Sequence, residues 1–362
     1  MKSHLHYIIS AIVVTTAGLQ PVDAARIVLV AGTGSKADNA PAKDIKLLEP
    51  FAVDFDPAGN MVIAEMGSGN RLLRMDQKGF VRVIGGSGEK GYGGDHGPAL
   101  DAVFNGMHNL AITTDGTIYL ADTWNNRIRK LAADSLEVTT VAGTGDKGFS
   151  GDGGDATKAV LGGIYCATLD FKDERLYMAD LHNRRIRYLN LKAGTVHAFA
   201  GNGQKGRPEE GAIAAKSPLV DPRAVAADRK GNVYILERGG HALRVVKPNG
   251  RIYTVVNAAG KKGATGDGGP AIEATMNGPK HICIDLEDNV IIADAENNLI
   301  RKYIPATGKI IRVAGNGKRG PEGVPGDPLK IGLARPHGVT VHKDGTLFIT
   351  DSYNNRVLKI VD

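Results

Sequence analysis

The chain has 362 residues, a formal net charge of +6 and 42% hydrophobic residues, which is ample for a buried core. Its basic residues are spread along the whole length and are not gathered in one run, so the composition argues against a nucleic-acid-binding arm. The 48 glycines indicate many tight turns.

The first 24 residues differ from the rest of the chain. Lys2 opens a short polar stretch, and residues 7–17 are nearly all apolar or small. Residues 22–24 (Val-Asp-Ala) place small residues where a signal peptidase reads them. This pattern predicts a signal peptide over 1–24, too short for a comfortable membrane span. We therefore expect a mature chain from about Ala25 that is exported to the periplasm or the extracellular space, with no integral membrane segment and no nucleic-acid partner.

A repeat runs through the rest of the chain. A short apolar run ends in an acidic residue six times, in steps of 57 or 58 residues, at Glu65, Asp122, Asp180, Glu237, Asp294 and Asp351. A unit of this size buries its apolar face only against its neighbours. Six such units, rich in short strands, predict an all-β, six-bladed β-propeller over residues 25–362, which we expect to be monomeric.

Each full repeat contains four predicted strands. In the second repeat they cover residues 108–113, 118–121, 127–131 and 138–142. Asn125 and Asn126 form the turn between the second and third of these strands, because Asn tolerates the left-handed conformation. Strand direction alternates, so the turns after the second strands and the loops after the fourth strands share one face. We call this the top face.

The two ends of the chain complement each other. The sixth repeat stops after its third strand, at about residues 356–361. Residues 26–31 form an apolar segment followed by Gly-Thr-Gly, as does the fourth strand of the second repeat. We therefore predict that residues 26–31 are the fourth strand of the last blade. This pairing closes the ring and removes its exposed sheet edges.

Several segments resemble the NHL repeat. They are residues 122–128 (Asp-Thr-Trp-Asn-Asn-Arg-Ile), 351–357 (Asp-Ser-Tyr-Asn-Asn-Arg-Val), 141–145 (Val-Ala-Gly-Thr-Gly) and 151–154 (Gly-Asp-Gly-Gly). The resemblance implies a propeller over nearly the whole mature chain. NHL propellers include interaction platforms, sensor domains and one enzyme, peptidyl-hydroxyglycine amidating lyase, which the chain resembles distantly.

In that lyase, histidines from alternate blades hold zinc, each just after a proline that opens the first strand of its blade. The resemblance places His108, Arg223 and His337 at these positions. Catalytic zinc usually has three protein ligands, and the permanently charged Arg223 cannot be one of them. His108 and His337 are therefore the metal candidates. We expect no cofactor, with a divalent ion, Ca²⁺ or Zn²⁺, as the alternative.

The same position in every repeat gives a set of candidate ligand-binding residues. It holds Phe51, His108, Tyr165, Arg223, Lys280 and His337. Trp124 and Tyr353 break the repeat two residues after an acidic residue, and exposed aromatic side chains beside a channel are typical of sugar or peptide contacts. The candidate site is therefore His108, Trp124, Tyr165, Arg223, Lys280, His337 and Tyr353. The alternative is that these polar groups face channel water and that the aromatic rings pack locally.

Two other recurring sets are predicted to be structural. The six acidic residues could form a ring for Ca²⁺, but we expect each to accept N–H bonds from its own Asn-rich turn. The glycine-rich loops carry Lys36, Lys90, Lys147, Lys205, Lys262 and Arg319. These could capture polyanions, but we favour solvated loops that Asp95, Asp152 and Asp267 partly neutralise.

The two cysteines are predicted to be free. Cys166 and Cys283 fall on the innermost strands of blades three and five, which are not neighbours. A disulfide needs Cα atoms within about 7 Å. We therefore expect two buried thiols.

These patterns favour an exported module that binds a neutral or anionic protein, peptide or glycan partner through its top face and channel mouth. The alternative is an enzyme, a metal-assisted lyase or lactone hydrolase, at the same mouth. That alternative needs a third metal-compatible ligand beside His108 and His337.

Overall fold

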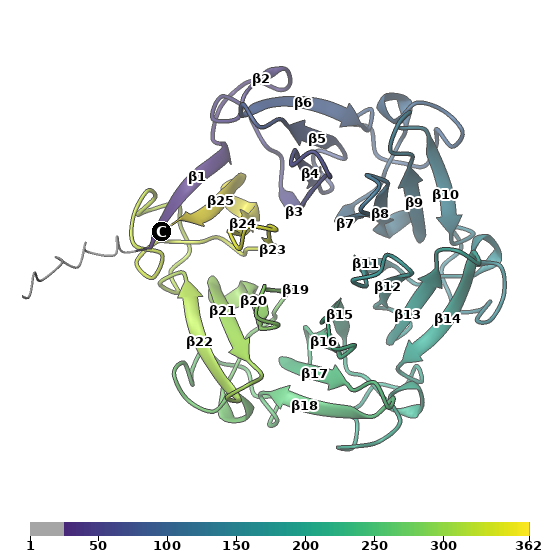
Figure 1. Ribbon diagram of the computed structural model, residues 1–362, viewed down its shortest axis with the longest axis vertical. Helices are drawn as coiled ribbons and strands as arrows, with labels where there is room; N and C mark the ends of the chain where they lie inside the picture. The colour runs from purple at the N-terminus through teal and green to yellow at the C-terminus, as the bar shows by residue number, and fades with distance from the viewer. Residues whose placement is uncertain (1–24, 362) are drawn as a thin grey trace, which may run out of the picture.

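The computed structural model describes residues 25–361, and these form six sheets arranged in a ring (Figure 1). The predicted signal peptide, residues 1–24, lies outside the described residues. Blade one contains β3 (Pro50–Phe55), β4 (Met61–Glu65), β5 (Leu72–Met75) and β6 (Phe80–Gly85), with the two-residue β2 (Ala40–Pro41) on its outer edge. Blade two contains β7 (Met107–Ile112), β8 (Ile118–Asp122), β9 (Arg127–Leu131) and β10 (Val138–Ala142).

The next three blades repeat this order. Blade three contains β11 (Ile164–Leu169), β12 (Arg175–Asp180), β13 (Arg185–Asn190) and β14 (Thr195–Ala200). Blade four contains β15 (Pro222–Ala227), β16 (Val233–Glu237), β17 (Ala242–Val246) and β18 (Ile252–Val256). Blade five contains β19 (His281–Ile284), β20 (Val290–Asp294), β21 (Leu299–Ile304) and β22 (Lys309–Ala314).

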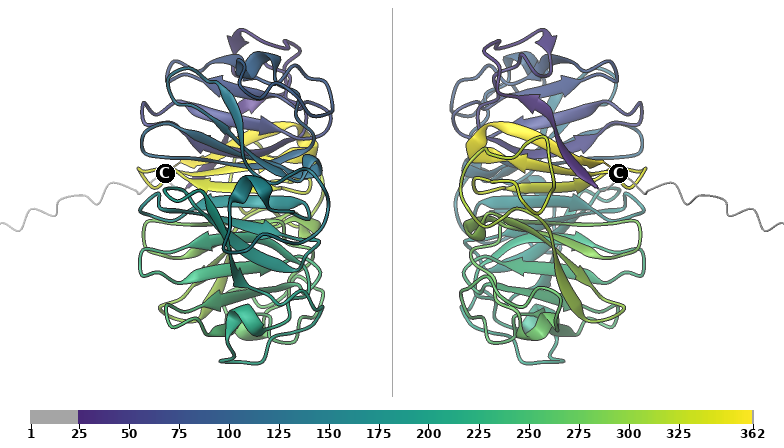
Figure 2. Two further views of the ribbon diagram at one scale, coloured as in Figure 1. Left: turned by 90° about the vertical axis from the view of Figure 1, so that its right-hand side faces the viewer. Right: turned by 90° about the vertical axis from the view of Figure 1, so that its left-hand side faces the viewer.

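Blade six confirms the predicted closure of the ring. It contains β23 (Gly338–Val341), β24 (Leu347–Asp351) and β25 (Arg356–Val361), and its fourth strand is β1 (Arg26–Gly32). The antiparallel pairing of β1 with β25 runs from Arg26 opposite Val361 to Gly32 opposite Arg356. Figure 2 shows β1 in purple beside the yellow strands of this blade. The all-β, six-bladed propeller predicted from the repeat is therefore confirmed.

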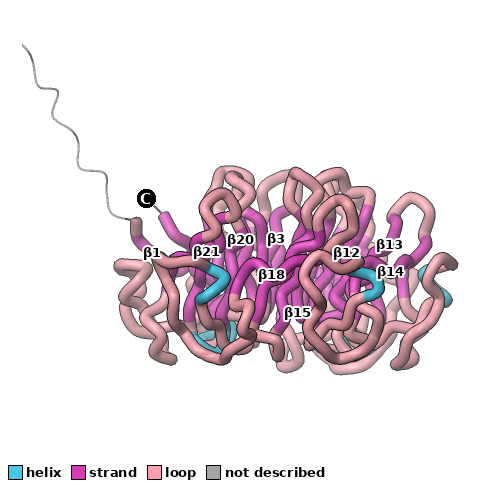
Figure 3. The backbone as a smooth tube through the Cα atoms, turned by 90° about the horizontal axis from the view of Figure 1, so that it is seen from below, coloured by secondary structure: helices cyan, strands magenta, loops and turns pink. Residues whose placement is uncertain are grey.

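Seven short 3-10 helices lie in the described loops. Four follow the outer strands, namely η1 (Ala99–Asp101), η3 (Ala156–Lys158), η4 (Ala214–Lys216) and η5 (Ala271–Glu273). Three follow the second strand of a blade, namely η2 (Thr123–Asn125), η6 (Ala295–Asn297) and η7 (Ser352–Asn354). Asn126 follows η2 with φ of 51°, the left-handed turn expected from the sequence. Figure 3 shows the strands in the middle of the disc and the loops on both faces.

In every blade the acidic residue that ends the second strand forms an ion pair with an arginine on, or just before, the third strand. In blade two, Asp122 is fully buried, and its carboxylate accepts hydrogen bonds from the Asn105 N–H, at 2.8 Å, and the Asn125 amide, at 2.8 Å. Arg129, also fully buried, lies 3.3 Å from Asp122 and 2.8 Å from Asp95. Burial raises the pKa of Asp122 to about 6, against the lowering effect of these donors. The carboxylate thus faces hydrogen-bond donors, as a structural role requires.

This clasp recurs and corrects two sequence predictions. Arg187 joins Asp180 to Asp152, and Arg301 joins Asp294 to Asp267. Asp95, Asp152 and Asp267 therefore pair with buried arginines of the third strands and do not neutralise the loop lysines. The backbone donors to the six acids also differ from the prediction, because they come from the segment before the first strand of each blade. They are the N–H groups of Leu48, Asn105, Gly162, Val220, Asn277 and Ala334. In four blades an Asn of the turn donates its side-chain amide to the acid, namely Asn125, Asn183, Asn297 and Asn354.

Both cysteines are free, as predicted. Cys166 is buried, but Cys283 is only partly buried because it lines a hollow in the central channel. Within residues 25–361, no helix has the length and apolarity needed to cross a bilayer.

Candidate functional site

The first residues of the inner strands converge at the top mouth of the central channel. Phe51 lies at the centre of the contacts: its ring stacks on His337 with centroids 3.9 Å apart and meets the edge of His108 at 5.2 Å. His108 meets Tyr165 at 4.5 Å, and the Arg223 guanidinium lies over the Tyr165 ring at 4.4 Å. One position of the repeat thus supplies a continuous chain of contacts across five blades.

The two histidines at the mouth are neutral, and each has one ring nitrogen, Nε2, that can accept a hydrogen bond. His108 Nδ1 lies 2.8 Å from the Gly106 carbonyl, and His337 Nδ1 lies 2.8 Å from the Arg335 carbonyl. Because a carbonyl only accepts, each Nδ1 carries the proton and each Nε2 keeps a lone pair. Burial, followed by the positive charge of Arg223, holds the pKa of both histidines well below the usual 6.5.

Arg223 is a buried cation without an anion. Its side chain donates one hydrogen bond, from Nη1 to the Tyr165 carbonyl at 3.2 Å, and its buried Nε has no partner. Arg223 is 5% exposed, yet no carboxylate lies within 4 Å of it among the described residues. By contrast, the buried Arg129, Arg187, Arg244, Arg301 and Arg356 each contact a carboxylate. Burial lowers the pKa of Arg223 to about 10.

Lys280 and two residues that sequence reasoning missed complete the mouth. Lys280 Nζ lies 3.2 Å from Glu296, which is also paired with Arg335. Arg335 donates to the Tyr353 hydroxyl at 2.9 Å, and the Tyr353 ring lies 5.7 Å from His337. Glu296 stands two residues after Asp294, where Trp124 and Tyr353 stand in their own repeats, so the repeat register could have found it. The mouth therefore holds Arg223, Lys280 and Arg335 beside the carboxylate of Glu296, and the ion pair of Arg238 with Asp221 lies close to Arg223.

Trp124 and Tyr353 form the rim above this ring. Trp124 is 42% exposed, its ring lies 5.7 Å from His108, and Lys90 Nζ sits 5.2 Å from the ring centroid. The ring also packs on glycine, since a Cβ at Gly106 would approach it to 2.5 Å. Trp124 therefore has a packed face and an exposed face. All seven predicted site residues lie at the mouth or its rim.

A hydrogen bond crosses the channel beneath the mouth. Asn109 Nδ2 on β7 and His281 Nε2 on β19 lie 3.0 Å apart, although these strands belong to blades two and five on opposite sides of the ring. We call this contact the channel bar. The repeat does not indicate how far a side chain reaches across the axis, so this role of His281 could not be predicted from the sequence.

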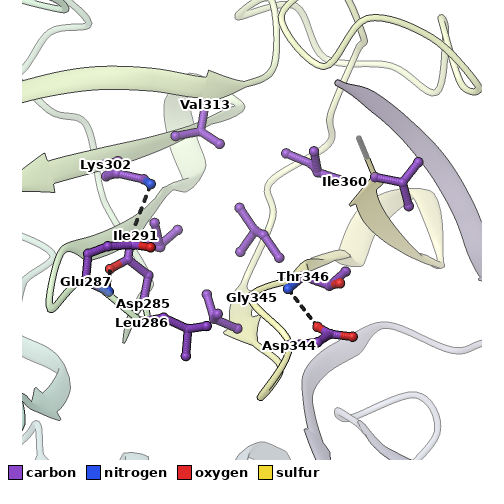
Figure 4. Close-up of a pocket in the computed structure, with 13 residues that line it drawn as sticks. Asp285, Leu286, Glu287, Ile291, Lys302, Val313, Asp344, Gly345, Thr346 and Ile360 are labelled. Atoms are coloured by element: carbon purple, nitrogen blue, oxygen red, sulfur yellow. Dashed lines mark hydrogen bonds and ion pairs between the residues drawn. The ribbon is translucent and has the colours of Figure 1, made fainter. Parts of the chain in front are cut away.

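A second hollow, of about 480 Å³, lies between blades five and six away from the mouth (Figure 4). Its Lys302 is paired with Asp285 at 3.1 Å, so the one cation of the lining already has an anionic partner. No cluster of three or more His, Cys, Asp or Glu side chains within residues 25–361 is arranged to hold a metal ion.

Comparisons with known proteins agree with this architecture. The NHL repeat model matches residues 333–360. The chain is 27% identical to the chloroplastic protein SUPPRESSOR OF QUENCHING 1 of Arabidopsis thaliana, over 77% of this chain and 27% of that protein. It is 26% identical to NHL repeat-containing protein 2 of Gallus gallus, over 87% of this chain and 46% of that protein. The chain thus spans less than half the length of these curated relatives.

Among solved structures, an auxiliary nutrient binding protein from Bacteroides thetaiotaomicron superposes with a TM-score of 0.68 at 15% identity, over 93% of this chain and 76% of that chain. At this identity the likeness concerns the fold alone.

Proposed function

The chain is a six-bladed β-propeller of the NHL-repeat type, and on that premise we propose that it works as an exported binding module. Its top face and channel mouth receive an anionic group carried by a protein, peptide or glycan partner. The solved propeller that is described as a nutrient binding protein fits a binding role for this fold. Fold alone does not fix function, so the proposal is argued from the site.

The observation that supports it is the unpaired Arg223. A guanidinium that is 5% exposed and has an orphan Nε has lost its hydration without gaining a counterion. An incoming carboxylate, phosphate or sulfate would supply both the charge and the missing hydrogen-bond acceptor. Lys280 lies on the neighbouring blade and adds a second cation, while His108 and His337 contribute aromatic surface and Nε2 acceptors.

The rim fits a partner that is larger than the anionic group itself. The exposed face of Trp124 and the ring of Tyr353 flank the mouth, and such rings stack on sugars and peptide side chains. Because the channel bar crosses the passage below, we expect only the end or a projecting group of a partner to enter the mouth.

The first test compares the anion affinity of the wild-type protein with that of a variant in which Arg223 is replaced. We expect inorganic phosphate, glucuronate or a short peptide with a free C-terminal carboxylate to bind in calorimetric titrations. Arg223→Met should weaken binding about 10–100-fold, because a hydrogen bond to a charged group contributes roughly 1.5–3 kcal/mol. The matched control is Lys205→Met, an exposed lysine in the loop before the same blade, which should leave the affinity nearly unchanged. Equal losses in both variants, or no binding by any probe, would refute the mouth as the site.

The second test is the pH dependence of this binding. Burial and the charge of Arg223 lower the pKa of Lys280 to about 8, so Lys280 loses its proton as pH rises through this value. Arg223, with a pKa of about 10, stays charged, and the two histidines stay neutral. Anion affinity should therefore fall between roughly pH 7 and pH 9. The Lys280→Met variant should bind more weakly and show a flat profile over the same range.

The enzymatic alternative is tested by metal analysis. The Nε2 lone pairs of His108 and His337 are suitable metal ligands, but the positive charges of Arg223 and Lys280 repel a cation at this mouth. A stoichiometric zinc or calcium ion that is lost in His108→Ala with His337→Ala would favour a metal-assisted lyase or lactone hydrolase over the binding module.

A further inference from the structure

A separate cavity of about 340 Å³ lies in the channel on the other side of the bar. The inner strands of all six blades line it, and Asn109 and His281 form its inner end. It opens toward the face that carries the turn of Asp170 and Asp173, opposite the mouth of Arg223. We call it the lower cavity. Its volume lies in the range of small-molecule sites, roughly 300–1,000 Å³.

The walls of the lower cavity are mostly aliphatic and small. They include Val53, Ala111, Ala226, Ile284 and Val341. Such walls favour the apolar body of a ligand and give no hydrogen bonds to its end groups. Any orientation of a ligand must therefore come from the few polar groups.

The formal charge of the lining is wholly negative, in a chain whose net charge is +6. Its carboxylates are Asp54, Asp170 and Asp173, and no Lys or Arg contributes to the lining. Asp170 and Asp173 are held in turns at the rim, where Asp170 accepts the Glu174 N–H. Asp54 is different, because it sits on the inner strand β3 itself.

Asp54 is an anion without a cation. Its two oxygens each accept one backbone N–H bond, from Phe55 and from Ile112, both at 2.9 Å. Each carboxylate oxygen can accept a further bond. No Lys or Arg lies within 4 Å of Asp54 among the described residues, and none lines the lower cavity.

We propose that the lower cavity binds a small organic ammonium ion, with its charged nitrogen on Asp54 and its apolar body against the aliphatic walls. The donor set favours an ammonium over a metal ion. Nε2 of the neutral His281 ring accepts the Asn109 amide N–H at 3.0 Å, so Nδ1 carries the ring proton and neither nitrogen has a free lone pair for a metal ion. No cluster of three His, Cys, Asp or Glu side chains arranged for a metal occurs within residues 25–361. An ammonium ion needs only acceptors, which the Asp54 carboxylate supplies.

The ionisation of the cavity agrees with this assignment. Burial, with a smaller contribution from Asp173, raises the pKa of Asp54 to about 6, so Asp54 carries its charge at neutral pH. The other titratable groups facing it are neutral there, because burial lowers the pKa of His281 to about 4 and raises that of the Cys283 thiol. Ammonium affinity should therefore fall as pH drops through about 6.

The experiment is a titration of the full chain with benzylammonium, benzyl alcohol and CaCl₂. We expect benzylammonium to bind, its neutral isostere benzyl alcohol to bind at least tenfold more weakly, and Asp54→Asn to abolish the difference. The matched control is Asp344→Asn, whose carboxylate lines the separate hollow between blades five and six and should not affect binding. Circular dichroism and the melting temperature establish that each variant is folded.

Three results would overturn the proposal. They are no benzylammonium binding at up to roughly 10 mM, equal affinity for benzyl alcohol, and displacement by Ca²⁺ with a stoichiometry that marks a metal site. If Asp54→Asn fails to fold, the wild-type affinity measured from neutral pH down through the Asp54 titration decides the question, since a flat profile contradicts a role for that carboxylate. Arg223→Met should leave benzylammonium binding unchanged, because the bar separates the two sites, so this proposal stands or falls independently of the anion site.

Discussion

Arg301→Met is expected to destabilise the propeller by about 3–5 kcal/mol, the usual effect of removing one partner from a buried ion pair. Arg301 is fully buried and joins Asp294, also fully buried, to Asp267 of the preceding loop. Methionine fills much of the same volume but leaves both carboxylates unpaired. Urea unfolding of the wild type and the variant measures the difference.

Arg223→Met provides the contrast for this prediction. Both arginines are buried, but Arg223 has no carboxylate to leave behind, so its replacement should be neutral or stabilising. Equal destabilisation of the two variants would mean that arginine packing, and not ion pairing, fastens the blades. If the Arg223→Met protein is as stable as the wild type or more so, Arg223 does not contribute to the free energy of unfolding, which supports a role in binding.

Deletion of residues 25–32 is expected to have the other large effect. The deletion removes β1, including the fully buried Ile27 and Ala31, and leaves β25 as an open edge. Burial of a single isoleucine contributes roughly 1.5–3 kcal/mol, and the lost strand pairing adds to this. We expect a loss of several kcal/mol, a large part of the 5–15 kcal/mol typical of a folded domain.

A circularly permuted variant tests whether the loss of stability comes from the lost pairing of β1 with β25 and not from the shorter chain. Residues 26–32 transferred behind Asp362 through an Asn-Gly turn would form a hairpin with β25 in the native register. This variant should recover most of the melting temperature. An unchanged melting temperature in the plain deletion would show that β1 does not hold the ring together.

The repeat was sufficient to predict the fold and the place of each mouth residue along its strand. A period of 57 or 58 residues fixes which positions are equivalent, so Phe51, His108 and His337 were expected to meet. Knowing which positions are equivalent does not indicate which side chains meet across the central axis. The contact of Asn109 with His281, for example, joins residues 172 positions apart. The partners of Asp95 and the absence of a partner for Arg223 likewise depend on packing between loops and strands.

The lower cavity was missed for a related reason. Asp54, Ala226 and Cys283 occupy the same position of three repeats, three residues after Phe51, Arg223 and Lys280, and each is unremarkable in its own strand. Only the closed ring places them around one hollow. Local sequence predicts the strands of one blade, whereas the candidate sites of this protein are formed by residues of several blades that meet at the central axis.

The closure of blade six also bears on how the molecule is made. Among the strands of residues 25–361, β1 is synthesised first, and it pairs with β25, which is synthesised last. During synthesis the other blades can assemble in order, but blade six stays incomplete until β25 emerges. Closing a flexible loop of this length would cost about 5 kcal/mol by the (3/2)RT ln n relation, and prior assembly of the intervening blades lowers this cost by bringing the two ends near each other. Completion of the ring therefore follows the synthesis of β25, and the pairing of segments so distant in the sequence is slower than the formation of the hairpins within one blade.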